Sequence, residues 1–509
     1  MHIHRFTGLL AAAIGMLGLA APAESATLLE IYQQALQRDP TIREADARRL
    51  AALEAVPQAR GAYLPQLGFG ASYETATSDG DGVQNAPIEQ PAGSGNFVVV
   101  PFPFQSRTES DTTAWSFTLR QTLFRWDQIV GLKQAEKQVA RAETVREAAQ
   151  QDLIVRVVTR YFDVLAAEDT LLAIHANRLA IARQLEQAKQ RFEVGLIAVT
   201  DVQESQAAFD QATADEIQAK RELARTRFLL REITGEYIRD LAAPGEGVPL
   251  KTPDPFNVEA WIDQSMAQNL DLIVSRIDEQ LARDEISSRR NGHLPTLDLV
   301  ASVGNRDVVS LQDTGLDVGA LPADSNFDRD SIGIEFNLPL FAGGATTSRV
   351  REAVYLHRAS REALQRVTRE TESVTRDSFL AVETDISRVQ ALRQAVQSSR
   401  TALEATEAGF EVGTRTIVQV LDQQFLLYDN IVRYYRARYD YILNTMRLKQ
   451  ASGTLSVQDL EALEPYLRPR KTPEEQFLEE ERAIAAGDEP PTLFEGPAVP
   501  PGAVAPENE

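Results

Sequence analysis

Residues 151–172 read QDLIVRVVTRYFDVLAAEDTLL, and their apolar pattern decides the fold. Apolar side chains recur here at steps of three and four residues, which is the spacing of a coiled-coil seam. The seam consists of Ile154, Val157, Val158, Tyr161, Leu165 and Leu172. A second seam later in the chain consists of Leu421, Phe425, Tyr428, Ile431 and Tyr435. This periodicity predicts packed helices, although a plain helix bundle would show it too.

Glycine and proline are missing from long stretches of the chain. Neither occurs between Gly131 and Gly195 or between Gly344 and Gly409, which leaves gaps of 63 and 64 residues, and a gap of 39 residues follows each. The stretches are rich in good helix formers. At about 1.5 Å per residue, the longer ones reach roughly 95 Å and need neighbours along their whole length. We expect helices over 127–193, 201–233, 345–409 and 416–452.

Four short segments alternate between apolar and polar side chains. In the last of them, Ile332, Ile334 and Phe336 alternate with Gly333 and Glu335. Each segment has about 9–10 residues, the length that a tilted strand needs to cross a bilayer. A soluble antiparallel sheet covering a core is the alternative interpretation. We expect strands near 67–75, 115–123, 297–305 and 332–340, with polar loops over 78–113 and 306–330.

Four strands are too few to close a membrane barrel, since the smallest barrels have about eight. A lone four-stranded sheet would leave two unpaired edges in lipid, where unsatisfied backbone groups are very costly. If the strands cross a membrane, several copies of the chain must therefore pool them. Counting alone permits two, three or four copies.

Composition excludes several classes of function. The chain has 509 residues, 43% of them apolar and 25% charged, as in folded proteins. Its net charge of −22 argues against a nucleic-acid partner. It has no cysteine, which excludes thiolate metal sites and disulfides. Its five histidines leave few residues for histidine-based catalysis. We expect no enzymatic activity, no metal and no cofactor.

The first 23 residues have the pattern of a secretory signal peptide. Arg5 precedes an apolar run from Leu9 to Ala20, and Ala21-Pro22-Ala23 fits a cleavage site, with Ala26 as a second possibility. The run is too short for a membrane-spanning helix, and no later stretch approaches 18 apolar residues. We therefore expect an exported protein that could enter a membrane only as a closed β-barrel.

The chain repeats itself internally. Phe-Glu-Val-Gly at 192–195 recurs at 410–413, and Leu-Pro-Gln-Leu at 64–67 has its counterpart Leu-Pro-Thr-Leu at 294–297. These offsets predict the duplication of one unit of about 210–230 residues. The predicted divisions are a signal peptide at 1–23, a first repeat at 27–241, a linker at 242–256, a second repeat at 257–467, and an acidic, proline-rich, disordered tail at 468–509.

Four motifs resemble the TolC family over about residues 27–467. They are RFEVGLIAVTDVQ (191–203), GHLPTLDL (292–299), LPLFAGG (338–344) and GFEVGTRTIVQVLD (409–422). The resemblance implies an α+β membrane protein of the Gram-negative outer membrane. It implies a homotrimer, in which four strands per chain form a twelve-stranded barrel that contacts outer-membrane lipid and continues into a periplasmic α-helical coiled-coil barrel. It also implies that the equatorial segment 457–467 contributes to a belt around the middle of the helical barrel.

The resemblance also implies a function. The family forms passive, non-enzymatic exit ducts for efflux pumps and type I secretion. Its partners are a periplasmic adaptor and an inner-membrane pump of the ABC, RND or MFS type. Two other functions fit parts of the sequence, namely a periplasmic adaptor and a structural coiled-coil surface protein. The duplicated hairpin with a strand pair in each copy favours the duct over both.

The same resemblance implies a gate at the periplasmic entrance. Its polar network maps to Thr200 and Asp201 on one turn and to Phe410 and Arg415 on the other. An arginine bound to a hydroxyl or carboxylate makes a strong, charge-assisted bond. Phe410 stands where the family has a tyrosine, so that hydroxyl bond is absent. The residues alone favour a simpler role for Asp201, as the N-cap of its helix.

An entrance constriction is also implied. The family places two aspartates one helical turn apart there, and this chain has Gln419 and Asp422. Three copies of Asp422 would form an acidic ring and three of Gln419 a neutral one, which predicts weaker cation selectivity than two acidic rings would give.

The turns Gly195-Leu196 and Gly413-Thr414 are candidate docking points for the adaptor. Plain turn chemistry would explain their glycines equally well.

Overall fold

The computed structural model describes residues 25–245, 248–313 and 321–486, and the expected signal peptide lies outside them. The chain divides into two compact units, and α4 (Trp126–Glu193) and α8 (Ala345–Glu411) contribute to both. These units are not the two sequence repeats, whose boundaries stay a prediction.

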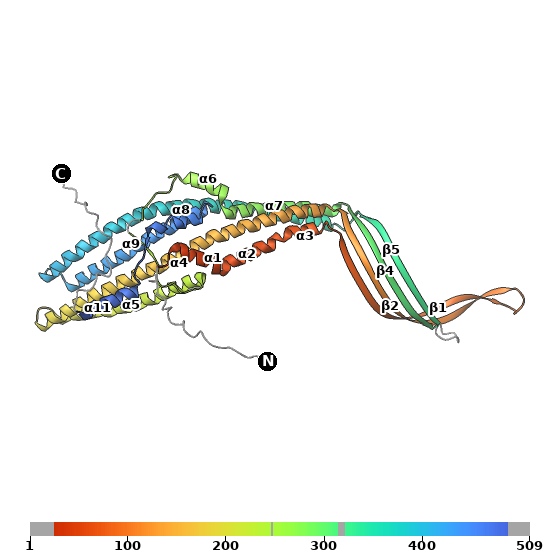
Figure 1. The fold of residues 1–509 in the computed structure, drawn as a ribbon, viewed down its shortest axis with the longest axis horizontal. Helices are drawn as coiled ribbons and strands as arrows, with labels where there is room; N and C mark the ends of the chain where they lie inside the picture. The colour runs from red at the N-terminus through yellow and green to blue at the C-terminus, as the bar shows by residue number, and fades with distance from the viewer. Residues whose placement is uncertain (1–24, 246–247, 314–320, 487–509) are drawn as a thin grey trace, which may run out of the picture. The chain divides into compact units, whose positions relative to one another are not determined.

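The unit formed by 49–143 and 275–364 contains a four-stranded antiparallel sheet. Its strands lie in the order β1-β2-β4-β5, so β1 and β5 are the outer strands (Figure 1). Their bounds are β1 Gln66–Glu89, β2 Phe97–Phe124, β4 Thr296–Asp313 and β5 Leu321–Asn337.

One face of this sheet is apolar and exposed. Phe69 lies opposite Phe117, with ring centroids 4.8 Å apart, and Phe117 lies opposite Val303 on the next strand. Ile332 on β5 is 77% exposed. Paired residues of an antiparallel ladder share a face, so these side chains form one apolar surface.

The opposite face of the sheet is polar. Arg120 on β2 donates to Asp298 at 3.2 Å and to Glu335 at 3.0 Å, which ties three strands together. The sheet therefore has the two-sided character that the alternating segments predict.

The prediction of loops over 78–113 and 306–330 is largely wrong, because most of the described residues in these ranges lie in strands. β1 continues to Glu89 and β2 begins at Phe97, with unbroken pairing from Gln66↔Arg120 to Glu89↔Phe97. β4 and β5 likewise extend into 306–330. The backbone bonds of a ladder do not require apolar side chains, so pairing continues where the alternation fades. The fourth strand ends at Asn337 rather than 340, since Pro339 has no N–H to donate.

Short helices and polar contacts complete this unit. α4 is joined to α7 by Lys137–Asp284 at 2.6 Å and by Arg141–Asp278 at 2.6 Å. The elements that lie in this unit or continue into it are α2 Pro40–Leu53, α3 Ala55–Gly61, α7 Leu270–Arg290 and the 3-10 turn η1 Asn291–His293.

The second unit is almost entirely helical. Beside the remaining parts of α4 and α8 it contains one two-stranded sheet, β3-β6. Its elements are α1 Leu28–Arg38, α5 Val199–Thr234, β3 Ala243–Pro244, α6 Val258–Gln268, α9 Ile417–Ala451, α10 Val457–Glu461, η2 Glu464–Tyr466, β6 Leu467–Arg468 and α11 Pro473–Ala486.

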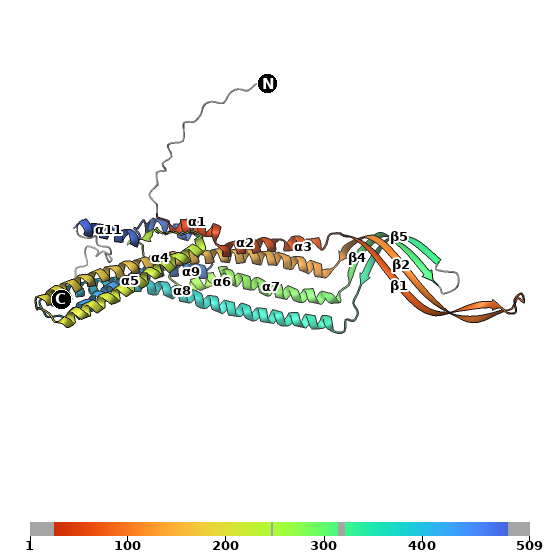
Figure 2. The same ribbon diagram turned by 90° about the horizontal axis from the view of Figure 1, so that it is seen from below.

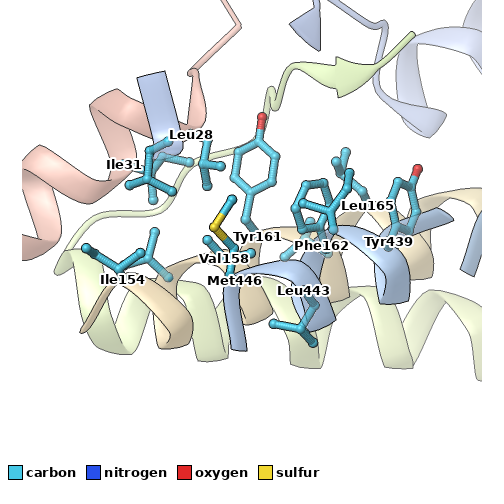
Figure 3. Close-up of a cluster of buried hydrophobic side chains, with 14 of the residues drawn as sticks. Leu28, Ile31, Ile154, Val158, Tyr161, Phe162, Leu165, Tyr439, Leu443 and Met446 are labelled. Carbon is cyan, nitrogen blue, oxygen red and sulfur yellow. The ribbon is translucent and has the colours of Figure 1, made fainter. Parts of the chain in front are cut away.

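The core of this unit joins helices that are far apart in the sequence. Figure 3 shows Leu28 of α1, Tyr161 and Leu165 of α4, and Leu443 and Met446 of α9 in one apolar cluster. Tyr161 and Leu165 belong to the seam predicted from residues 151–172, and both are completely buried.

The C-terminal segment corrects another expectation. We predicted disorder over 468–509, but residues 473–486 form α11, beside α4 and α5 (Figures 1 and 2). Thr472 accepts a hydrogen bond from the Glu475 amide at 3.3 Å, and the Glu475 carboxylate accepts one from the Thr472 amide at 3.2 Å. This reciprocal cap, together with ion pairs to other helices, orders the segment. Residues 487–509 lie outside the described chain.

Within the part of the chain that the structure describes, no helix combines the length and the apolarity that crossing a membrane requires.

Candidate functional site

Two helix–turn–helix ends contain all of the predicted site residues. α4 and α5 form one hairpin and α8 and α9 form the other. Gly195 and Gly413 have φ values of 76° and 78°, in the left-handed region that other residues rarely adopt. The amide of Leu196 donates to the Arg191 carbonyl at 2.8 Å, and that of Thr414 to the Gly409 carbonyl at 2.8 Å. Both turns are thus closed by the same helix-ending motif.

The two turns differ in how the following helix begins. Thr416 is the N-cap of α9 and forms a reciprocal capping box with Gln419. Ala198 is the N-cap of α5, where no side chain caps the helix. The N-cap role considered for Asp201 is therefore wrong. Its carboxylate lies in the first turn of α5, where a negative charge is favourable beside the helix dipole.

The predicted gate residues are only partly brought together. Phe410 packs beneath the guanidinium of Arg191, whose central carbon lies 4.9 Å from the ring centroid. This contact joins the ends of the two hairpins. Thr200 and Arg415 are exposed, and Asp201 is half-buried. Among the residues described, no ion pair joins Asp201 to Arg415 within one chain.

Two residues of this site were not identified from the sequence, Arg191 and Gly409. They occupy equivalent positions in the two Phe-Glu-Val-Gly motifs, as RFEVG and GFEVG. A Cβ added to Gly409 would lie 2.7 Å from Cγ of Arg415, so glycine leaves the space that Arg415 occupies. The difference between the two motifs could have identified these residues from the sequence. At matched positions, one motif has a positively charged arginine and the other has a glycine without a side chain.

The predicted constriction residues have different surroundings. Gln419 is exposed, but its side-chain oxygen accepts a hydrogen bond from the Thr416 amide at 3.1 Å. The amide side chain is thus engaged with its own helix end. Asp422 is exposed on α9, just after Gln419. Of the two, Asp422 is the one that carries a charge.

A further acidic group lies near the end of α8. Burial raises the pKa of Glu407, and the carboxylates of Glu404 and Glu411 raise it further. These three residues follow one another at helical spacing just before the turn, so their carboxylates repel one another and the protonated form of Glu407 is favoured.

The described residues contain no group of three or more histidines, aspartates or glutamates placed to hold a metal ion.

Comparison with known proteins identifies the family. The sequence matches the family described as outer membrane efflux protein over residues 31–236 and 261–454. The chain belongs to this family. It is 36% identical to outer membrane protein TolC of Escherichia coli over 484 residues, which cover 94% of this chain and 93% of TolC. It is 28% identical to the alkaline protease secretion protein AprF of Pseudomonas aeruginosa, over 88% of each chain.

The fold agrees with this assignment. The crystal structure of the Campylobacter jejuni CmeC outer membrane channel matches with a TM-score of 0.65 at 14% identity, over 92% of this chain and 97% of that one. As an outer membrane efflux protein, the chain is an outer-membrane exit duct for efflux and type I secretion. Its relatives are channels, and no enzyme family is indicated.

The contact between Arg191 and Phe410 generates a prediction for this efflux protein. A cation over an aromatic ring contributes about 0.5–1 kcal/mol at an exposed site. We expect a double-mutant cycle with Arg191→Gln and Phe410→Leu to give a coupling of that size in the free energy of unfolding. The matched control is Phe192→Leu combined with Arg191→Gln. A coupling no larger than that of the control pair would show that the contact does not join the hairpins.

Proposed function

We propose that three copies of the chain assemble into one duct, with a twelve-stranded barrel in the outer membrane and a helical barrel in the periplasm. The duct passively conducts small molecules or proteins from an inner-membrane pump to the exterior through a gated periplasmic entrance. It has no enzymatic activity of its own. The observation that carries this proposal is the four-stranded sheet with outer strands β1 and β5.

The sheet supports assembly through its edges and its apolar face. β1 and β5 each have one edge at which their backbone N–H and C=O groups form no ladder with another described strand of the same chain. The face of the sheet that contains Phe69 and Ile332 is exposed. In lipid an apolar face is stable, but the unpaired backbone N–H and C=O groups of an open edge have no hydrogen-bond partner. Pairing β1 of one copy with β5 of the next removes every edge, and three copies give the twelve strands that the family resemblance implies.

An internal duplication supports the helical part of the proposal. Each repeat would supply one strand pair and one long hairpin, β1–β2 with α4–α5 and β4–β5 with α8–α9. Both hairpins end in a glycine turn with the same backbone bonds. Three chains would then line the periplasmic tunnel with six similar hairpins.

The turns support docking of a periplasmic adaptor. Leu196 is 74% exposed and Val412 is 75% exposed, each beside the glycine of its turn. The Thr414 hydroxyl donates to the Gly409 carbonyl at 3.0 Å, which adds a side-chain bond to that turn. Exposed apolar side chains on the two turns suit the helical tip of an adaptor, which would connect the duct to an ABC, RND or MFS pump.

The assembly itself is directly testable. The detergent-solubilised protein from outer membranes should have the mass of three chains in native mass spectrometry and should retain adaptor and pump in a pull-down. A monomer found in the soluble periplasmic fraction would exclude the duct. The two alternative functions would give different results, since an adaptor would fractionate with the inner membrane and a surface stalk would retain no pump.

The gate predicts a change in conductance. Arg415 has no ion-pair partner among the described residues of its own chain, so we propose that it binds Thr200 and Asp201 of a neighbouring copy. Replacing Arg415 and Asp201 by Ala should increase the conductance of the trimer in planar bilayers severalfold, because charge-assisted bonds that hold the entrance closed are lost.

The control is Arg433→Ala, which removes an exposed pair with Asp429 within α9 at 2.8 Å. If the gate variants conduct like this control, the proposed network does not hold the entrance closed.

The constriction predicts a change in ion selectivity. Gln419→Glu keeps an acceptor for the Thr416 amide and adds one charge per chain, whereas Gln419→Asp adds the charge with a shorter side chain. Both should increase cation selectivity and block by multivalent cations, measured as reversal potential and single-channel current. Asp422→Asn should do the opposite. Reversal potentials that stay at the wild-type value in all three variants would place the selectivity elsewhere.

A further inference from the structure

The C-terminal segment 470–486 provides charged partners for buried groups of α4 and α5, and the entrance itself does not explain these pairs. We propose that this segment is a clasp that positions the α4–α5 and α8–α9 hairpins and thereby keeps the entrance closed. The inference rests on the proposed gate and adds a second set of positioning residues, remote from the turns.

The first contact of the clasp joins the two hairpins. Asp169 of α4 is 1% exposed and accepts a hydrogen bond from the Tyr439 hydroxyl of α9 at 2.6 Å. Its other oxygen accepts one from Arg470. Arg470 thus neutralises the carboxylate that links α4 to α9. A buried carboxylate that loses its cation is strongly destabilised, so the link depends on the clasp.

The second contact joins α4 to α5. Arg227 of α5 is 6% exposed, and it donates to Glu168 of α4 at 2.9 Å and to Glu474 of α11 at 2.6 Å. Burial raises the pKa of Glu168 to about 7, although Arg227 and Arg470 oppose the rise. Glu474 thus gives the buried guanidinium of Arg227 a second carboxylate partner beside Glu168.

The third contact lies nearer the turns. His175 of α4 is 8% exposed and its Nε2 lies 3.1 Å from Glu480 of α11, while its other nitrogen lies 3.3 Å from Glu216 of α5. Phe477 packs on the imidazole with 3.9 Å between the ring centroids. Glu216 also pairs with Arg178 and Lys220. α11 therefore contacts α5 through Glu474 and α4 through Glu480 (Figure 2).

The clasp lies far from the turns, so a small rotation of the helices at the clasp displaces the turns by a larger distance. Asp169 precedes the end of α4 at Glu193 by 24 residues, which is about 36 Å of helix. Nearer the turns, the described contacts between the hairpins include a neutral hydrogen bond from Gln424 to the Asn177 carbonyl at 3.2 Å and the contact of Arg191 with Phe410. A rotation of about 5° at the clasp would displace the turns by about 3 Å over that length. Such a displacement is enough to separate hydrogen-bonded gate residues.

Isosteric variants test the clasp. Glu474→Gln with Glu480→Gln keeps the shape of α11 and removes the buried charge of Glu480 together with the exposed charge of Glu474 that pairs with the buried Arg227. The control is Glu479→Gln on the same helix, whose partner Lys471 is exposed. We expect the double variant to conduct at least twofold more than wild type in planar bilayers, and the control to conduct like wild type. Tyr439→Phe, which removes only the hydroxyl on Asp169, should give a smaller increase.

A stability measurement separates positioning from a merely structural role. Thermal unfolding of each trimer is recorded beside its conductance. Tyr439→Phe serves as the readout if the double variant does not fold. Conductance at the wild-type level in every folded variant would overturn the clasp. If Arg415→Ala opens the channel while the clasp variants do not, the clasp alone is wrong. If the wild-type protein forms no trimeric channel, the proposed function is wrong.

Discussion

The long helices exist only because an apolar stripe is buried along part of their length. α4 has 68 residues, far beyond what helix propensity supports in isolation. Its buried side chains, among them Tyr161 and Leu165, lie against α1 and α9 in the main core. Burial of α4 continues to Ala188, and only at the turn itself are Val194 and Leu196 exposed.

Features of the fold that depend on local spacing could be predicted from the sequence. The gaps between Gly131 and Gly195 and between Gly344 and Gly409 contain most of α4 and α8, because helix-breaking residues act locally. The apolar alternation in 332–336 lies within β5 for the same reason. The ends of the strands were harder to predict, because β1 continues to Glu89 through backbone pairing, which requires no alternating pattern of side chains.

Contacts between distant residues could not be predicted from spacing. α11 has no apolar period, and its order depends on Arg227 and His175, which lie on other helices. One local signal was present, since Thr472 and Glu475 form a capping box with Pro473 between them. Gln419 is similar, because its engagement with Thr416 follows from a capping spacing that we interpreted only as part of a pore ring.

The distribution of apolar and polar contacts explains how such a molecule could open without unfolding. Within the α8–α9 hairpin, Val396, Leu427 and Ile431 form a separate apolar cluster, so this hairpin is held together by packing. Between the ends of the two hairpins, the half-buried guanidinium of Arg191 lies over the half-buried ring of Phe410. Apolar packing is lost steeply with separation, whereas polar groups that separate at a wet interface regain hydrogen bonds to water. Rotation of one hairpin against the other therefore costs less than bending either, which is the mechanical property that a gated entrance requires.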